Sequence, residues 1–391
     1  MNEQIKIGSI IKQIRGVSYK PTDVREADEK NAVALLRANN IQETGLNFDD
    51  LVYIDRSMVK SEQYLRAGDI LICSSSGSKN LVGKAAYVPD DLPCSFGAFC
   101  KVVRTQAVDS YYLGQYFQSP RYRQEISEAS AGANINNIRN EHIDELTIPA
   151  HSKSEQMEIV QILLCLNEQI DCTKQQLEKL DELVKSRFVE MFGDPISHLD
   201  RGETKQLDRI AERITVGFVG EASNDYVEAG VPYLRTQNVR VNHIDLEGLI
   251  YVNESFHKKN SKSIIRPGDI VISRVGANRG MAAVIPESLP EANIANCLIV
   301  GRTNLIDSCY LAFYLNMSYG KRPQFGASVG SAQGVVNTSV LKKWEIYVPE
   351  KKEQKEFVEY VNQVDKSKLA VQQSLEKLET LKKSLMQQYF G

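Results

Sequence analysis

The chain contains an internal duplication, and this feature constrains its fold more than any other. Residues 175–193 read QQLEKLDELVKSRFVEMFG, and residues 373–391 read QSLEKLETLKKSLMQQYFG. Ten of these nineteen positions are identical at a constant offset of 198 residues. Unrelated segments would match at about one position, given ordinary residue frequencies. The repeat therefore predicts two copies of one structural unit.

Both copies carry apolar residues at alternating spacings of three and four. The register runs through Leu163, Leu166, Ile170, Thr173, Leu177, Leu180 and Val184, and again through Val361, Val364, Lys368, Val371, Leu375, Leu378 and Lys382. A mean spacing of 3.5 residues is typical of helices that pack along a seam. We expect the two helices to pair with each other. The alternative is an ordinary amphipathic helix lying on each domain.

The duplication extends beyond the helices. Leu36–Ile41 matches Leu234–Val239, and Gly68–Ile72 matches Gly268–Ile272. Leu146–Pro149 corresponds to Ile346–Pro349 just before each helix. These matched segments predict four parts of the chain, in the order variable domain at 1–150, helix at 151–193, second variable domain at 194–349 and second helix at 350–391.

Each variable domain alternates short β-branched runs with turn residues, which is typical of strands in a mostly-β domain. The predicted strands are Asp69–Cys73, Val231–Leu234, Asp269–Ser273, Met281–Ile285 and Cys297–Val300. Short amphipathic helices are expected at Tyr111–Phe117 and Tyr310–Met317. With the two long helices, the predicted fold class is α+β, with two mostly-β domains of similar fold.

Composition is that of an ordinary globular protein, with 42% hydrophobic and 25% charged residues. No apolar run is long enough to span a bilayer, so we expect no membrane partner and a cytoplasmic location. The seven cysteines are odd in number and lack C-x-x-C spacing, and the five histidines form no pair at helical spacing. This pattern predicts reduced thiols and no metal site.

Catalytic motifs are absent. The nearest approach to a phosphate-binding loop, Gly77–Ala85, has the wrong spacing and an alanine where magnesium would need a hydroxyl. Glu350, Lys351 and Lys352 have a nuclease-like spacing, but no upstream acid pairs with them and they open a charged helix. We therefore expect no catalytic residue in this chain.

Net charge is −3, which by itself does not favour a nucleic-acid partner, because affinity for DNA comes largely from neutralising phosphates. Residues 1–150 hold 17 basic and 19 acidic side chains, and residues 194–349 hold 17 and 16. A DNA site on this chain must therefore be a local patch or draw positive charge from a partner.

Polar clusters recur at matching places in both domains. Arg, Asn and Gln read base edges in the major groove, and one bidentate contact discriminates by about 1–3 kcal/mol. The candidate DNA-binding residues are Arg37, Asn39, Asn40, Ser75, Lys79, Asn80, Arg235, Gln237, Asn238, Arg274, Asn278, Arg279, Lys321 and Arg322. Arg121 and Arg123 are further candidates for phosphate contacts. Each could equally be a solvated loop side chain.

Two variable domains, each followed by a near-identical helix ending in LEKL…K-S…F-G, resemble the specificity subunit of type I restriction–modification systems. LRTQNV, PGDIVIS and VNTSVLKKWEIYVPEKKEQ in the second half are similar to that family's target-recognition domains and their boundaries. The first domain departs from these motifs, with RANNI and AGDILIC at the matching places.

The resemblance implies a function. Each target-recognition domain would read one half of a bipartite site on double-stranded DNA, and the helices would form an antiparallel coiled coil with pseudo-twofold symmetry that sets the gap. Two methyltransferase subunits carrying S-adenosylmethionine would bind the helices, and restriction (motor nuclease) subunits could join them. Two other classes stay open, a coiled-coil scaffold without DNA specificity and an enzyme with an unrecognised site.

Overall fold

The computed structural model describes residues 3–42, 45–78, 81–105, 107–130, 137–195, 203–319 and 337–391. The chain forms two compact units, and each long helix contributes one part to each of them. The first unit comprises residues 1–175 and 371–391, and the second comprises residues 176–370. Each unit is described by itself below.

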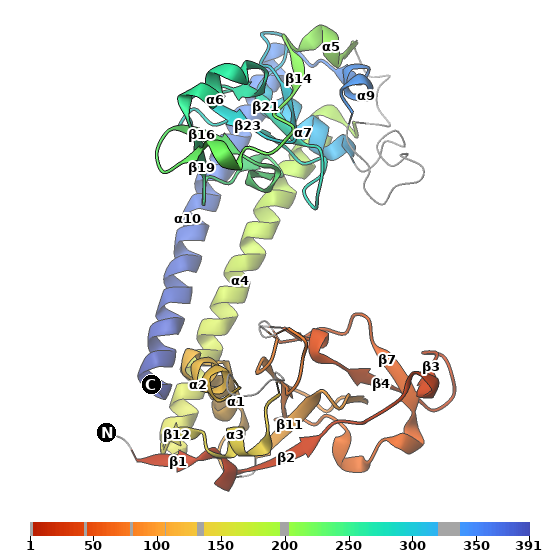
Figure 1. The fold of residues 1–391 in the computed structure, drawn as a ribbon, viewed down its shortest axis with the longest axis vertical. Helices are drawn as coiled ribbons and strands as arrows, with labels where there is room; N and C mark the ends of the chain where they lie inside the picture. Colours follow the sequence, from red (N-terminus) through yellow and green to blue (C-terminus); the bar gives the residue numbers. More distant parts are fainter. Residues whose placement is uncertain are drawn as a thin grey trace. The chain divides into compact units, whose positions relative to one another are not determined.

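The first unit contains two four-stranded sheets (red to orange in Figure 1). One is fully antiparallel, in the order β2 (Ile11–Arg15), β11 (Cys100–Thr105), β8 (Ile70–Cys73), β9 (Ala85–Tyr87). The other has the order β10 (Cys94–Phe96), β4 (Ala32–Leu36), β7 (Val52–Asp55), β3 (Val24–Arg25). Its β10–β4 pair is parallel. Two-stranded pairs join β1 (Gln4–Lys6) to β12 (Thr147–Pro149) and β5 (Ile41–Gln42) to β6 (Gly45–Leu46).

The second unit repeats this arrangement. Its antiparallel sheet has the order β14 (Ile214–Val216), β24 (Cys297–Val300), β21 (Ile270–Ser273), β22 (Ala282–Val284). Its mixed sheet has the order β15 (Tyr226–Val227), β19 (Ile250–Val252), β16 (Val231–Leu234), β23 (Ala292–Ile294), β20 (Ile264–Ile265). The pair β16–β23 is parallel, as β4–β10 is in the first unit. Two-stranded pairs join β13 (Thr204–Gln206) to β25 (Glu345–Tyr347) and β17 (Val239–Arg240) to β18 (His243–Ile244).

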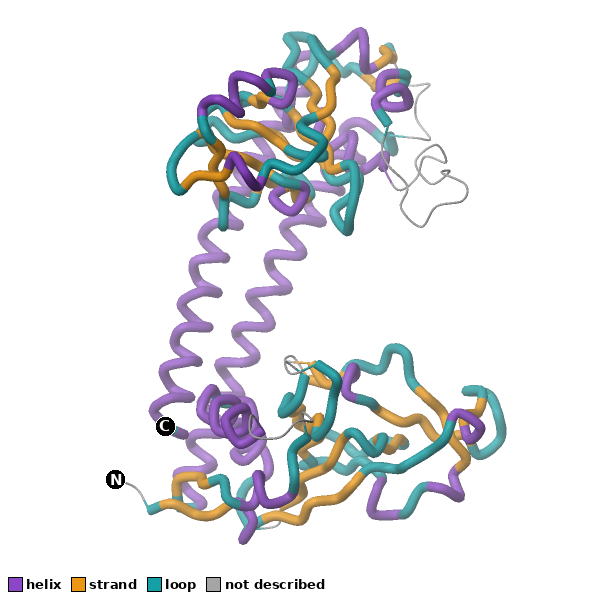
Figure 2. The backbone as a smooth tube through the Cα atoms, viewed as in Figure 1, coloured by secondary structure: helices purple, strands orange, loops and turns teal. Residues whose placement is uncertain are grey.

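Short helices pack on these sheets (purple in Figure 2). They are α1 (Ser110–Gln118), α2 (Pro120–Ser130) and α3 (Asn140–Asp144) in the first unit, and α5 (Leu207–Ile210), α6 (Glu254–Lys259), α7 (Ser308–Tyr319) and α9 (Thr338–Lys342) in the second. The predicted strands Val231–Leu234 and Cys297–Val300 have the bounds expected from the sequence. The α+β class with two similar mostly-β domains is confirmed.

The Gly-Asp-Ile motif that occurs in both halves of the sequence forms a similar turn in each unit, with a buried aspartate after a glycine of positive φ. Gly68 and Gly268 have φ values of 85° and 84°, in the left-handed region that glycine adopts without strain. The next residue, Asp69, is fully buried and accepts hydrogen bonds of 2.6 and 2.7 Å from the Arg104 guanidinium. Asp269 instead accepts 2.7 Å from Arg213. In each unit, the strand that follows the aspartate is thus held by an ion pair to a buried carboxylate.

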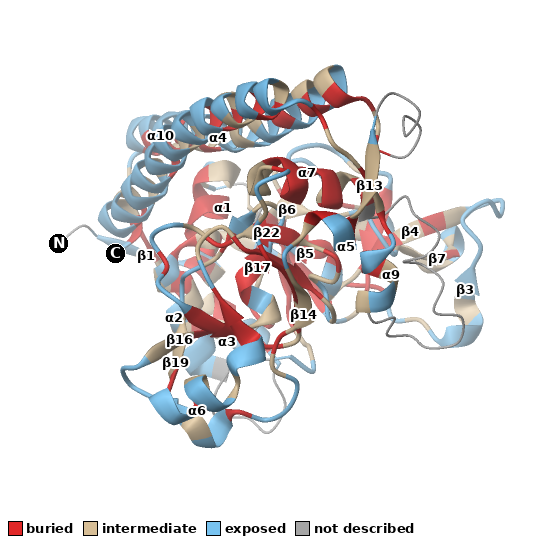
Figure 3. Cartoon of the chain, turned by 90° about the horizontal axis from the view of Figure 1, so that it is seen from above, coloured by how far each residue is buried: buried red, intermediate tan, exposed pale blue. Residues whose placement is uncertain are grey.

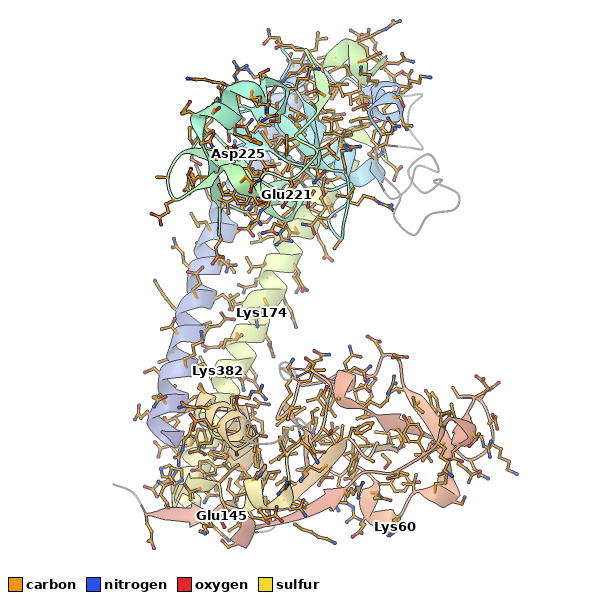
Figure 4. All side chains as sticks on the ribbon, in the orientation of Figure 1. Lys60, Glu145, Lys174, Glu221, Asp225 and Lys382 are labelled. Carbon is orange, nitrogen blue, oxygen red and sulfur yellow. The ribbon has the colours of Figure 1, made fainter. Side chains whose placement is uncertain are left out.

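The two long helices, α4 (Lys153–Phe192) and α10 (Lys351–Phe390), run antiparallel. In the first unit, Ile159 and Leu163 near the start of α4 share a core with Met386 and Phe390 at the end of α10. Lys174 of α4 pairs with Glu379 at 3.6 Å, and Figure 4 labels Lys174 and Lys382 on the two helices.

In the second unit the opposite ends meet. Phe188, near the end of α4, packs edge-on against Phe357, near the start of α10, with ring centroids 5.4 Å apart. Arg187 donates to Glu356 at 2.7 Å. The antiparallel packing is therefore evident within each unit, and the prediction of an antiparallel helix pair is confirmed.

All ten residues predicted for the apolar seam are buried or partly buried, whereas the outward helix surfaces are exposed (pale blue in Figure 3). The buried members are Leu163, Leu166, Ile170, Val361, Val364 and Leu375, and the partly buried members are Leu177, Leu180, Val371 and Leu378. Lys382 also lies at a seam position, and loss of water contact there lowers its pKa.

One buried glutamine anchors the start of each long helix to its domain. Gln156 accepts from the Asp109 backbone N–H at 2.9 Å and donates to the His151 carbonyl at 2.8 Å. Gln354 accepts from the Asp307 N–H at 2.7 Å and donates to the Pro349 carbonyl at 2.8 Å. None of the helices in the described ranges is long and apolar enough to cross a membrane.

Candidate DNA interface

In the first domain, strand β4 ends in a tight turn at Arg37–Asn40, which we call the Arg37 turn. The Asn40 side chain closes it, accepting from the Arg37 N–H at 2.8 Å and donating to the Asp49 carbonyl at 2.8 Å. Asn39, between them, is exposed. The Arg37 guanidinium donates to the Asp50 carboxylate and carbonyl, both at 2.7 Å. The turn therefore presents Asn39 and part of Arg37 to solvent.

The second domain repeats this turn at Arg235–Asn238, the Arg235 turn. Asn238 accepts from the Arg235 N–H at 2.9 Å and donates to the Asp245 carbonyl at 3.0 Å. Gln237 takes the exposed place of Asn39. Because the two turns have the same hydrogen bonds, their exposed side chains occupy matching positions.

These contacts correct the assignment of Asn40 and Asn238 as base-reading residues. The two residues are only 1% and 2% exposed, and the oxygen and nitrogen of each amide are both hydrogen-bonded to the backbone of the same domain. A buried amide whose nitrogen and oxygen are both bonded to the surrounding backbone is not placed to read a base edge. The two asparagines shape the turns, and Arg37, Asn39, Arg235 and Gln237 stay as candidate contacts.

A second turn, Gly97–Cys100, lies beside the Arg37 turn. The Gly97 N–H donates to the carbonyl of Leu36, the residue before Arg37, at 2.9 Å. On its other side, the backbone N–H groups of Ser74 and Ser75 donate to the Phe99 carbonyl at 2.9 and 3.0 Å. The Arg37 turn and the partly buried candidate Ser75 are therefore brought together, with Phe99 between them. Sequence reasoning missed Phe99.

The second domain brings its candidates together in the same way. The Ala295 N–H donates to the Leu234 carbonyl at 2.9 Å, and the Arg274 N–H donates to the Asn296 carbonyl at 3.2 Å. Around this point lies a hollow of about 490 Å³. Its lining includes Arg235, Gln237 and Asn296, together with the acidic Glu221, which Figure 4 labels.

Asn278 has a different role from the one predicted. Its amide donates to the carbonyls of Thr236 and Val239 at 3.2 and 3.1 Å, so it ties the glycine-rich loop to the Arg235 turn. Its carbonyl oxygen lies 3.5 Å from the Arg240 guanidinium. Asn278 is thus a bridge between loops. Arg274 and Arg279 are partly buried in the same loop, and the exposed Arg240 joins the candidates.

Four predicted contacts lie outside the described residues, namely Lys79, Asn80, Lys321 and Arg322. Arg121 and Arg123 are described, and Arg121 is not placed for phosphate. It donates to the Phe390 carbonyl at 2.6 Å, to Glu125 at 2.8 Å and to Thr147 at 3.0 Å. Its guanidinium holds the end of α10 against α2.

One donor atom is left unused at the same place in both domains. The Nε of Arg37 and the Nε of Arg235 are buried, and neither has a hydrogen-bond partner in the described parts of the chain. Buried donors are nearly always paired in folded proteins, so the same exception at two matching arginines is a feature that the two turns share. Guanine edges and phosphates are acceptors of the kind that arginine binds.

Within the described ranges, no group of three or more His, Cys, Asp or Glu side chains is placed to hold a metal ion. All seven cysteines are free thiols. Burial raises the pKa of Cys73 and of Cys94 to about 11, which keeps both as neutral thiols near pH 7.

Comparison with known proteins assigns the family. The model of the type I restriction modification DNA specificity domain matches the chain twice, over residues 2–182 and 203–381. The chain belongs to this family. Each match contains one of the two domains, including its arginine turn.

Similar proteins extend over nearly the whole chain. The EcoKI specificity subunit of Escherichia coli (strain K12) is 28% identical over 407 residues, which cover 98% of this chain and 87% of that protein. The StySPI specificity subunit of Salmonella potsdam is 29% identical over 409 residues, with the same coverage.

Two solved structures share the fold. A chain from work on complex assembly and conformational transition of the type I restriction–modification system has a TM-score of 0.58 at 17% identity, covering 99% of this chain and 97% of that one. The type I S subunit from M. genitalium has a TM-score of 0.54 at 15% identity, covering 100% and 96%.

Proposed function

We propose that this chain is the sequence-reading subunit of a type I restriction–modification complex. Each domain would read one half of a bipartite site on double-stranded DNA. The observation that carries the proposal is an arrangement of two turns that occurs in both domains. In each, the arginine turn lies beside a second turn, and the arginine Nε is buried without a hydrogen-bond partner in the described residues. The two matches of the family's domain model to this chain support the proposal.

The turns fit this role because their frames are alike and their exposed residues differ. Asn39 and Gln237 occupy the same position, as do Phe99 and Asn296. Two readers built on one frame but carrying different side chains would select different sequences. Such a pair suits the two unequal halves of an asymmetric site.

We assign chemistry to partner subunits. Two methyltransferase subunits would dock on α4 and α10 and bind S-adenosylmethionine, and restriction subunits could join them in the cytoplasm. Exposed apolar side chains on the long helices support a docking role, namely Met157, Leu164, Leu183, Leu369 and Leu381. This chain would supply no catalytic group. Incubation of the purified chain with labelled S-adenosylmethionine and DNA should transfer no label, and transfer without a partner would contradict this assignment.

Domain exchange tests the function directly. Residues 194–349 are replaced by the second domain of another specificity subunit, and the DNA methylated by the resulting complex is sequenced. One half of the methylated motif should change and the other should stay. If neither half changed, or both did, the assignment of one domain to one half-site would be wrong.

The helices would set the distance between the half-sites. Adding one heptad to both α4 and α10 keeps the apolar seam in phase and lengthens the pair by about 10.5 Å, or roughly three base pairs. The methylated motif should then carry a wider gap between unchanged halves. An unchanged gap in a complex that still methylates DNA would show that the helices are not the spacer.

A scaffold without DNA specificity is the competing function. The two are separated by measuring binding of the assembled complex to its motif and to a scrambled duplex over a range of salt concentrations. A sequence reader prefers its motif, and its affinity falls with salt as counterions are released. A scaffold shows no preference between the two duplexes.

A further inference from the structure

Phe99 is exposed beside the Arg37 turn. Its residue surface is 70% exposed, the largest fraction of any exposed large hydrophobic residue in the described parts of the chain. A single exposed apolar residue is ordinary on a protein surface. What sets Phe99 apart is its position and the rigidity of its backbone.

The backbone around Phe99 is held from three sides. The Cys100 N–H donates to the Gly97 carbonyl at 2.8 Å and closes the turn. Besides the two backbone donors described above, the Ser74 hydroxyl donates to the Phe99 carbonyl at 2.9 Å. Because the main chain is fixed and the ring is free of the core, the ring is presented outward from a defined point between the Arg37 turn and Ser75.

The second domain shows what this position does. Its matching turn is one residue shorter, and Asn296 takes the place of Phe99, with its carbonyl accepting from Arg274 as that of Phe99 accepts from Ser74. Asparagine reads adenine through N6 and N7 in the major groove, and an apolar side chain at such a place contacts the thymine methyl group, in the same groove.

We propose that Phe99 contacts the 5-methyl group of a thymine in the half-site read by the first domain, and so helps to determine its sequence. The proposal rests on the proposed function. It assigns one side chain to one base. It also predicts that the half-site contact made by Asn296, at the matching position, does not weaken when a thymine methyl group is removed.

The test uses the complete chain assembled with the methyltransferase of its own system. The motif is first obtained by sequencing methylated DNA, and domain exchange identifies the half read by the first domain. Affinities are then measured for duplexes in which each thymine of that half is replaced in turn by deoxyuridine, which lacks only the methyl group.

For the unaltered complex, one replacement should weaken binding by about fourfold, the value expected for one buried methyl group. With Phe99→Ala, the same replacement should have no effect, and binding to the thymine duplex should already be weaker by about fourfold or more. Phe99→Leu, which stays apolar, should retain part of the methyl dependence.

Val24→Ala is the matched control, because Val24 is 43% exposed and lies on β3 at the opposite edge of the sheet from β10. It should leave the methyl dependence unchanged. Should every thymine replacement affect the unaltered and Phe99→Ala complexes equally, the assignment of Phe99 is overturned while the function stands. An unaltered complex with no preference for its motif would overturn the proposed function instead.

Discussion

On the same sheet position, the two domains bury chemically different residues. Lys101 on β11 lies opposite Ile72, and Leu298 on β24 lies opposite Ile272. Lys101 is only 7% exposed and donates to Gln13 at 3.1 Å and to Asn140 at 2.8 Å. Leu298 is fully buried among apolar neighbours. A shared backbone frame therefore tolerates a buried cation in one domain and a leucine in the other.

The buried aspartates that hold these sheets are the same in both domains. Asp69 and Asp269 are both buried behind a glycine of positive φ, and each receives an arginine. The arginine itself has moved, from Arg104 on β11 in one domain to Arg213 just before β14 in the other. The buried carboxylate must be paired, but its donor can come from the adjacent strand, as Arg104 does, or from beside a strand two places away in the sheet, as Arg213 does. The aspartate acceptor is therefore the part of this contact that both domains keep.

The largest expected effect comes from removing that acceptor. Asp69→Ala leaves the Arg104 guanidinium, whose side chain is 16% exposed, without its charge partner, and should destabilise the first unit by about 3–5 kcal/mol. Asp269→Ala should cost less, about 1.5–3 kcal/mol, because Arg213 is 32% exposed and can be hydrated. Hydrogen exchange of β11 and β24 measures each unit separately.

The two variants serve as controls for each other, since each should leave exchange in the other unit unchanged. Equal losses of protection for Asp69→Ala and Asp269→Ala would contradict the argument that exposure of the arginine sets the difference.

The next effect is a pH dependence confined to one domain. Burial lowers the pKa of Lys101 to about 8 from its usual 10.5. A cation with a lowered pKa binds fewer protons in the folded state between these values, so the free energy of unfolding rises with pH there. The gain from pH 8 to 10.5 should total about 3 kcal/mol and should vanish in Lys101→Leu, the residue found in the second domain.

This difference is measured by urea unfolding of wild type and Lys101→Leu across that pH range, followed by hydrogen exchange of β11. The comparison with the variant cancels contributions from other groups that titrate there. A parallel pH dependence in the two proteins would show that Lys101 is not the group responsible.

Periodic features of this molecule could be predicted from the sequence, because periodicity reflects which face of an element is buried. The helix register predicted a seam whose residues are all buried or partly buried, and β16 and β24 have their expected bounds. The repeat predicted two similar domains, because an offset shared by several anchors is not expected by chance.

The site could be predicted only in outline. Asn39 and Asn40 are adjacent asparagines that the sequence cannot distinguish. Asn39 is exposed, whereas Asn40 is only 1% exposed, because the turn geometry decides which amide points inward. Residues 94–105 read CSFGAFCKVVRT, which hides an exposed phenylalanine and a buried lysine in an apolar run. Contacts between segments distant in the chain set both outcomes.

A moderate and equal effect is expected at the two glutamine anchors. Gln156→Met and Gln354→Met keep the side-chain volume but leave a backbone donor and a backbone acceptor, which are at least partly buried, without their partner, at a cost of about 2 kcal/mol each. Because the anchors share two hydrogen bonds, and Gln354 adds only a long one of 3.3 Å to the Leu305 carbonyl, the two losses should agree within about 1 kcal/mol. Hydrogen exchange at the start of α4 and of α10 measures them, and a large difference would show that the anchors are not equivalent.

The smallest effect distinguishes ion pairs between the helices. Lys174–Glu379 in the first unit joins two side chains that are each 46% exposed, so its coupling energy should be about 0.2–0.5 kcal/mol. Lys368–Asp181 in the second unit places its lysine at a seam position, where the side chain is 27% exposed, and should couple by about 0.5–1 kcal/mol.

Double-mutant cycles with Lys→Met and acid→Ala changes measure both coupling energies. A salt concentration of 1 M should reduce the coupling of Lys174–Glu379 proportionally more, because that pair is better hydrated. If the exposed pair proved the stronger, burial at the seam would not be what strengthens these contacts.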